Sequence, residues 1–136
     1  MRLNTHLTFN GECRAAFEFY EKCLGAKIQF MMTYGESPMP ALSSPDWGTR
    51  IIHGTLVLGN ELLTGADAPS EIYRKPQGFA VFFSVDEPAE ADRVFTALAE
   101  NGVIQMPIQA TFWALRFGML VDRFGTPWMI NCGKPV

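Results

Sequence analysis

The chain has 136 residues, 48% of them apolar and 18% charged, which is enough apolar material for a packed core and excludes a disordered chain. Its formal net charge is −3 and its basic residues are scattered, so we expect neither nucleic acid nor a membrane as a partner. No apolar run is long enough to span a membrane, and the first residues turn polar too soon for a signal peptide. We therefore expect a cytoplasmic protein.

The three cysteines agree with this expectation. Cys13, Cys23 and Cys132 are an odd number and show no C-x-x-C spacing. Such a pattern indicates neither a disulfide framework nor a zinc knuckle. We interpret all three as structural thiols.

The first elements follow simple periodicities. Residues 3–9 alternate apolar and polar side chains, which predicts a strand. Asn10 is the expected N-cap of the next helix, and Gly25 is its expected stop. The apolar positions of this helix follow helical spacing and are Cys13, Ala16, Phe17, Tyr20 and Leu24.

Three more strands are predicted at 26–34, 50–58 and 61–64, the last two joined by a two-residue turn at Gly59-Asn60. The segment 35–48, GESPMPALSSPDWG, is expected to be an exposed loop of the length that often forms a lid. On this loop, Met39 and Trp47 either close over a cavity or cover a dimer interface.

The second half repeats this plan. A strand at 79–85 leads into a helix capped by Asp86 or Glu87 and ended by Asn101-Gly102. Further strands are predicted at 103–106, 115–121 and 128–132, with residues 122–125 as a hairpin loop. The apolar positions of the second helix match those of the first and are Ala91, Val94, Phe95 and Leu98.

The repeat predicts an α+β fold made of two βαβββ modules. The first module spans 1–67 and the second 78–136, and residues 68–77 connect them within a single domain. Large aromatic side chains gather in the C-terminal ribbon, where one face can join the core and the other can line a cavity.

Three stretches carry a resemblance to a known family. They are LTFNGECRAAFEFYEKCLGAKI at 7–28, GESP at 35–38 and TFWALRFGMLVDRFGTPWMIN at 111–131. The chain resembles the vicinal-oxygen-chelate superfamily of glyoxalase I, bleomycin-resistance proteins and extradiol dioxygenases, and within it the PhnB-like branch. This resemblance implies paired modules that curl round a central cavity. It also implies a homodimer in which modules can be exchanged between chains.

The resemblance also implies where a divalent metal would bind in the metal-dependent members. Their ligands are His, Gln or Glu side chains from the first and last strands of each module. Carried over to this chain, the positions fall on Asn4 with His6 nearby, on Thr64 or Gly65, on Ala80 and on Met129. Because Ala and Met cannot serve as such ligands, we expect no family-type metal site and no cofactor. The alternative is a divalent ion held by His6, His53 and Asp67.

Five residues are candidates for ligand binding, and each of them also has a purely structural interpretation. His6 and His53 face polar or mixed sides of predicted strands, and each either binds a ligand or is a hydrogen-bonded packing residue. Arg116 lies in an apolar strand, where it either binds an anionic or carbonyl-bearing ligand or pairs with a carboxylate such as Asp122. Trp113 and Trp128 either stack on a planar ligand or pack in the core.

Three functions remain open at this point. The first is a PhnB-like protein that binds a small, partly aromatic or carbonyl-containing molecule without a metal, its exact role undetermined. The second is a metal-dependent lyase, isomerase or dioxygenase of the superfamily. The third is a structural or regulatory dimer with a filled cavity. No phosphate-binding glycine loop and no Ser/His/Asp order are present, so nucleotide cofactors and hydrolase chemistry are not expected.

Overall fold

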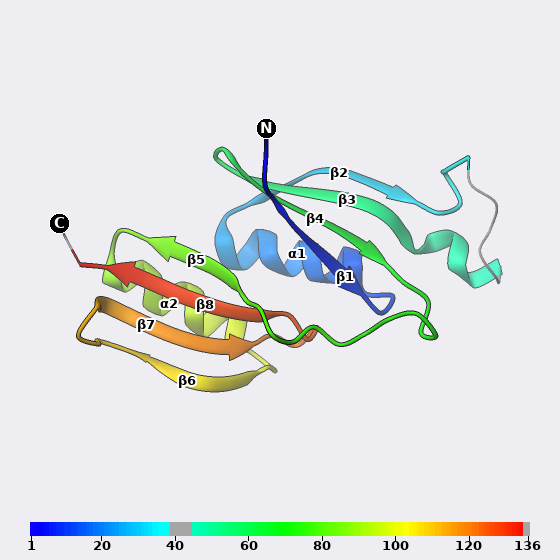
Figure 1. The fold of residues 1–136 in the computed structure, drawn as a ribbon. Coiled ribbons are helices and arrows are strands. Elements are labelled where there is room, and N and C mark those ends of the chain that lie inside the picture. Colours follow the sequence, from blue (N-terminus) through cyan, green and yellow to red (C-terminus); the bar gives the residue numbers. More distant parts are fainter. Residues whose placement is uncertain (39–44, 135–136) are drawn as a thin grey trace. The chain divides into compact units, whose positions relative to one another are not determined.

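The computed structural model describes residues 1–38 and 45–134. The chain divides into two units, Met1–Arg74 and Lys75–Val136. Each unit has one α-helix and its own four-stranded mixed sheet, with the elements in the order βαβββ (Figure 1). The predicted α+β fold and its repeated pattern are therefore confirmed, while the predicted central cavity stays a prediction.

The first unit forms the sheet β1-β4-β3-β2. Strand β1 runs parallel to β4, and the other neighbours are antiparallel. Its elements are β1 (Thr5–Phe9), α1 (Cys13–Leu24), β2 (Lys27–Thr33), the 3-10 helix η1 (Pro45–Thr49), β3 (Ile51–Leu58) and β4 (Glu61–Asp67).

The second unit repeats this topology in the sheet β5-β8-β7-β6, again with its outer pair β5 and β8 parallel. Its elements are β5 (Val81–Val85), α2 (Pro88–Ala99), β6 (Val103–Gln109), β7 (Ala114–Val121) and β8 (Pro127–Gly133). No α-helix among the described residues of either unit is long and apolar enough to cross a membrane.

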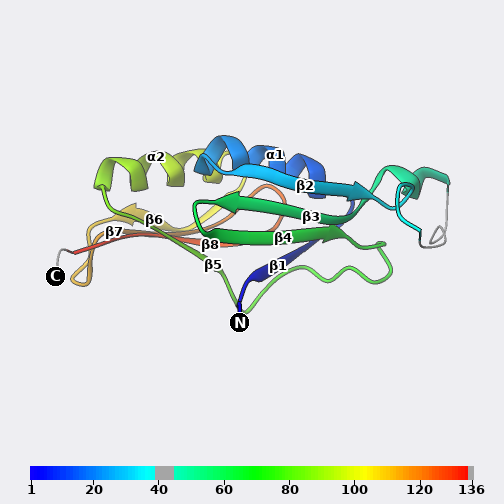
Figure 2. The same ribbon diagram turned by 90° about the horizontal axis from the view of Figure 1, so that it is seen from above.

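Each helix packs against one face of its own sheet, as both ribbon views show (Figures 1 and 2). In the first unit the ring of Phe17 lies against Gly54 and Gly65. In the second unit the ring of Phe95 lies against Gly118. The core of each unit therefore lies between helix and sheet, and we call the other face of each sheet its open face.

The start of α1 differs from the prediction. The N-cap position is Glu12 rather than Asn10, and no local side chain caps the helix. Instead, the Cys13 N–H donates to Oδ1 of Asp67, the last residue of β4, at 2.8 Å. A cap supplied by a residue so distant in the chain leaves no mark in the local sequence. The stop at Gly25 is confirmed, with φ of 75°.

Two strands are longer than predicted. β4 continues to Asp67 because its last residues pair with β1. This parallel pairing joins the first and last strands of the unit, which are far apart in the sequence. β6 continues to Gln109 past Pro107, and its pairing with β7 shifts register between Met106 and Gln109. A proline is tolerated there because β6 is the edge strand of its sheet.

Candidate functional site

A row of polar side chains crosses the open face of the first sheet. His6 pairs in register with Thr64, and Thr64 pairs with Thr55. His53 lies two residues before Thr55 on the same strand, so its side chain points to the same face. The structure thus brings the two histidines of the sequence together with two threonines, which we call the His–Thr row.

Hydrogen bonds order the two ends of the His–Thr row. Nδ1 of His6 lies 2.6 Å from Oγ1 of Thr64, and Nε2 of His53 lies 3.4 Å from Oγ1 of Thr55. In either tautomer of His6, its Nε2 stays available to a ligand, as a donor when Nδ1 accepts from Thr64 and as an acceptor when Nδ1 donates. The row is therefore oriented by the protein and still has unused hydrogen-bonding capacity.

The electrostatics of the row favour a neutral imidazole at His6. Partial burial and the nearby His53 both lower the pKa of His6 below its ordinary value of 6.5. The ring of Phe30, 45% exposed, lies 6.1 Å from the ring of His53. Phe30 pairs in register with Thr55, so it extends the row to the edge strand β2. A neutral, partly aromatic surface suits uncharged carbonyl or planar ligands.

Asp67 does not join the two histidines. It follows Gly65 on the helix-facing side of β4 and is 3% exposed. Its Oδ1 accepts from the Cys13 N–H and its Oδ2 from the Ile51 N–H, each at 2.8 Å. Burial raises the pKa of Asp67, although these hydrogen bonds act in the opposite direction. The alternative metal set of His6, His53 and Asp67 therefore does not assemble, because the carboxylate faces the other side of the sheet.

The second open face offers no better ligands for a family-type metal. There Phe82 pairs with Met129, Met129 with Met119, and Met119 with Met106, so a Phe–Met row crosses all four strands. Thioethers and a phenyl ring do not replace the imidazoles and carboxylates that such an ion requires. Over residues 1–38 and 45–134, no group of three or more His, Cys, Asp or Glu side chains is placed to hold a metal ion. The residues present do not fit the family metal.

Trp128 lies in the core of the second unit rather than on its open face. It is 1% exposed, and its indole N–H donates to Oδ2 of Asp122 at 2.9 Å. Oδ1 of Asp122 accepts from the backbone N–H groups of Phe124 and Thr126 in the hairpin loop. We therefore leave Trp128 out of the candidate site, because its ring packs beneath the helix.

The suggested pairing of Arg116 with Asp122 is wrong. Nε of Arg116 lies 3.2 Å from Oδ1 of Asp92 on α2, while Asp122 holds Trp128 and its own hairpin. Arg116 alternates with Phe117 and so projects to the helix side of β7. A carboxylate partner was one of the two alternatives for Arg116, and the structure supplies one from a helix in place of the adjacent turn.

Trp113 lies at the surface before β7, 47% exposed. Its ring packs edge-on against Phe112 at 4.8 Å and Phe117 at 5.4 Å between ring centroids. In the 3-10 helix η1, the ring of Trp47 lies 5.9 Å from that of Tyr34. A lid role for Trp47 stays a prediction, and Met39 lies outside the described residues.

Comparison with known proteins identifies the class. The model of the Glyoxalase/Bleomycin resistance protein/Dioxygenase superfamily matches residues 2–130, and the chain belongs to this superfamily. Protein YjdN from Escherichia coli (strain K12) is 35% identical over 144 residues, which cover 98% of this chain and 97% of that protein. The family predicted from the sequence is thus confirmed.

Solved structures show the same fold. Protein PA1353 from Pseudomonas aeruginosa is 43% identical, covers 99% of both chains and gives a TM-score of 0.91. A structure titled putative 3-demethylubiquinone-9 3-methyltransferase, PhnB protein, from Bacillus cereus gives a TM-score of 0.81 at 23% identity, over 98% of this chain and 100% of that one. At that identity the likeness to a PhnB protein concerns the fold alone.

Proposed function

We propose that this chain is a PhnB-like binding protein for a small, partly aromatic or carbonyl-containing molecule. The ligand binds on the open face of the first sheet. The observation that carries the proposal is the His–Thr row, in which threonines orient both histidines while the ring of Phe30 stays exposed beside them. A few convergent polar groups on a partly apolar surface are typical of small-molecule sites.

In the proposed complex, Nε2 of His6 makes a hydrogen bond to the ligand, and Phe30 contacts its planar part. Thr64 does not need to touch the ligand, because its hydroxyl fixes the orientation of the His6 ring. We propose that binding requires no divalent ion. At the corresponding positions of the second sheet the side chains are those of the Phe–Met row, which supply no imidazole or carboxylate.

A thermal-shift screen tests the proposal. Aromatic antibiotics and 2-oxo compounds are added to chelator-treated protein, because a ligand that binds the folded state raises the melting temperature. At least one compound should stabilise the wild type, and Thr64→Val should reduce that shift. Thr96→Val, an equivalent change on the exposed face of α2, should leave the shift unaltered. A shift that appears only with added metal would support a metal-dependent lyase or dioxygenase, and no shift across a broad panel would support a structural dimer.

We also propose that the protein is a cytoplasmic homodimer in which modules can be exchanged between chains. The buried thiols Cys13, Cys23 and Cys132, which form no disulfide, support a reducing compartment. Exposed Val103 and Ile104 on the edge strand β6 support self-association. Sedimentation equilibrium is the test, and a monomer at micromolar concentration would contradict the dimer.

A further inference from the structure

Three methionines lie side by side on the open face of the second sheet. Met106 of β6 pairs in register with Met119 of β7, and Met119 pairs with Met129 of β8. All three side chains are half-buried, so an ion in solution can reach them. We call these three residues the methionine triad. The proposed function uses the first sheet and leaves the triad without a role.

The core of the second unit fixes the direction in which the triad points. Met119 and Met129 are each flanked in the chain by two residues that pack on the helix side of the sheet. Those flanking residues are Gly118, Leu120, Trp128 and Ile130. Because successive side chains of a strand point to opposite faces, Met119 and Met129 project away from α2. Met106 faces the same way as its register partner Met119.

The spacing of the triad allows its three sulfur atoms to meet at one point. The Cβ atoms of residues paired directly across antiparallel strands lie about 4.5–5.5 Å apart. A methionine side chain is unbranched and has three rotatable bonds, so the sulfur atoms of Met106 and Met129 can turn inward over Met119. The three thioethers can then surround a single ion above the middle strand.

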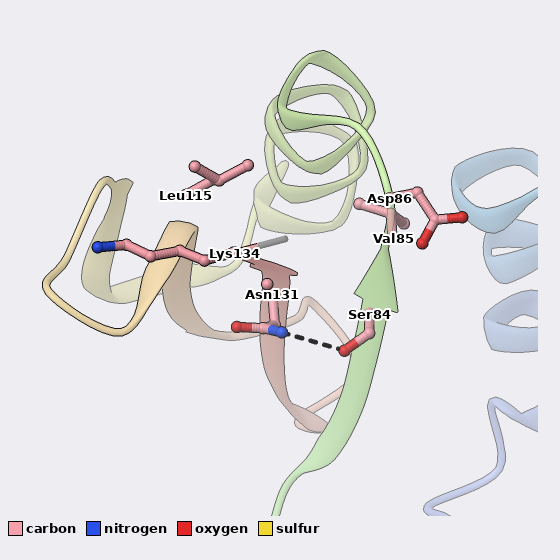
Figure 3. Close-up of a pocket in the computed structure, with 7 residues that line it drawn as sticks. Ser84, Val85, Asp86, Leu115, Asn131 and Lys134 are labelled. Atoms are coloured by element: carbon pink, nitrogen blue, oxygen red, sulfur yellow. Dashed lines mark hydrogen bonds between the residues drawn. The ribbon is translucent and has the colours of Figure 1, made fainter. Parts of the chain in front are cut away.

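The neighbours of the triad on β5 and β8 are neutral. Phe82, 57% exposed, is the register partner of Met129. Two residues further along these strands, Nδ2 of Asn131 donates to Oγ of Ser84 at 3.2 Å, so these two side chains bond to each other (Figure 3). Figure 3 also shows the carboxylate of Asp86 turned away from this pair. The triad is therefore bordered here by an aromatic ring and a neutral polar pair.

We propose that the methionine triad binds a soft monovalent cation, Cu(I). Thioethers are soft ligands that select Cu(I) over the harder divalent ions. A single charge also costs less to bring onto a neutral surface than a double charge does, and the face of the Phe82 ring attracts a cation. The side chains that do not fit the family metal thus fit a softer ion. The proposal does not depend on ligand binding by the His–Thr row.

The thiols of the chain are stronger soft ligands than thioethers, but burial shields them. Cys13, Cys23 and Cys132 are 0%, 3% and 0% exposed. Burial also raises the pKa of Cys13 to about 12, so this thiol stays protonated at neutral pH and is a poor ligand. The triad therefore offers soft ligands that an ion can reach without opening the core.

The test is a titration of full-length protein labelled with ¹³C at its methionine methyl groups, which gives one signal for each of seven methionines. Silver nitrate in chloride-free buffer is the first probe, because Ag(I) shares the charge and thioether preference of Cu(I) and is stable in air. The signals of Met106, Met119 and Met129 should shift together and saturate at one equivalent. Cu(I), kept reduced by ascorbate without oxygen, should shift the same signals, and Zn(II) should not.

Met119→Leu preserves the volume of the side chain and should weaken binding roughly tenfold or more. Met31→Leu makes the same change in the first unit and should bind as the wild type does. Met32→Leu tests a rival site, because Met32 pairs in register with His53. The methyl spectrum of each variant establishes that it is folded.

Three results would overturn the proposal. In the first, the triad signals do not respond to the first equivalent of Ag(I), as when the thiols take the ion. In the second, Met119→Leu binds as tightly as Met31→Leu. In the third, Met32→Leu abolishes binding and Met119→Leu does not, which would place the ion on the first sheet.

Discussion

Two buried aspartates hold the architecture together, one in each unit. Asp67 joins the start of α1 to the start of β3 by accepting from the backbone N–H groups of Cys13 and Ile51. Asp122 fixes its hairpin loop and the ring of Trp128. A buried carboxylate whose two oxygens both accept hydrogen bonds is a structural element, so ligand binding has to come from other residues.

Trp128→Phe tests this assignment of Trp128. The change removes the indole N–H and leaves Oδ2 of Asp122 buried without that donor, so the free energy of unfolding should fall by about 1–3 kcal/mol. Trp113→Phe is the matched control at a half-exposed position and should change stability by no more than about 0.5 kcal/mol. Urea denaturation measures both. Equal effects of the two changes would contradict the assignment.

His6 gives a prediction about pH. Because its pKa is lowered below 6.5, the folded chain takes up its proton at lower pH than the unfolded chain does. The free energy of unfolding should therefore decrease as pH falls below 6.5, and His6→Gln should remove this part of the decrease. In an NMR titration, His53→Gln should raise the pKa of His6 towards 6.5, since it removes the neighbouring charge. An unaltered pKa in that variant would exclude the proposed proximity of the two rings.

At the scale of elements, the two helices are fixed by the same contact. Phe17 and Phe95 occupy the same place in the two apolar patterns, and each ring lies on a strand glycine. A Cβ atom at Gly65 would lie 2.7 Å from Cζ of Phe17, and one at Gly118 would lie 2.6 Å from Cε2 of Phe95. Each helix can approach its sheet this closely only because these strand positions have no side chain.

Gly65→Ala and Gly118→Ala should therefore each lower the free energy of unfolding by about 1–3 kcal/mol, as overpacking does. Gly48→Ala is the control, because a Cβ atom there would meet nothing within 4 Å. It should leave stability within about 0.5 kcal/mol of the wild type. Thermal or urea unfolding of the three variants measures these changes in the free energy of unfolding. If neither strand substitution lowers it, the helices lie farther from the sheets than described.

The elements could be predicted from the sequence because their signals are local. Apolar spacing, Gly25 and the turn at Gly59-Asn60 depend only on neighbouring residues, and the repeat of the pattern reinforced each assignment. What could not be predicted depends on distant partners. Asp67 caps a helix whose first residue, Cys13, lies 54 residues before it, and Asp92 is brought to Arg116 by the packing of α2 on β7.

At the scale of the whole molecule, one topology is used twice with different open faces. The first sheet presents the His–Thr row, and the second presents the Phe–Met row at the corresponding place. Both histidines were candidates from the sequence, but Thr64 and Thr55 were not identified as their partners. Threonine in a strand is common, and only the register shows that these two lie beside the histidines. Proteins that share one fold can bind different ligands when the residues on such a sheet face differ.

A titration of metal-stripped protein, followed at the imidazole ring protons of His6 and His53, tests the proposed binding site most directly. Compounds that stabilise the protein in the thermal screen are added to the wild type and to Thr64→Val. We predict that both rings shift saturably in the wild type without any divalent ion and that Thr64→Val weakens the response. Rings that do not respond to any such compound, or respond only once metal is restored, would contradict metal-free binding on the first open face.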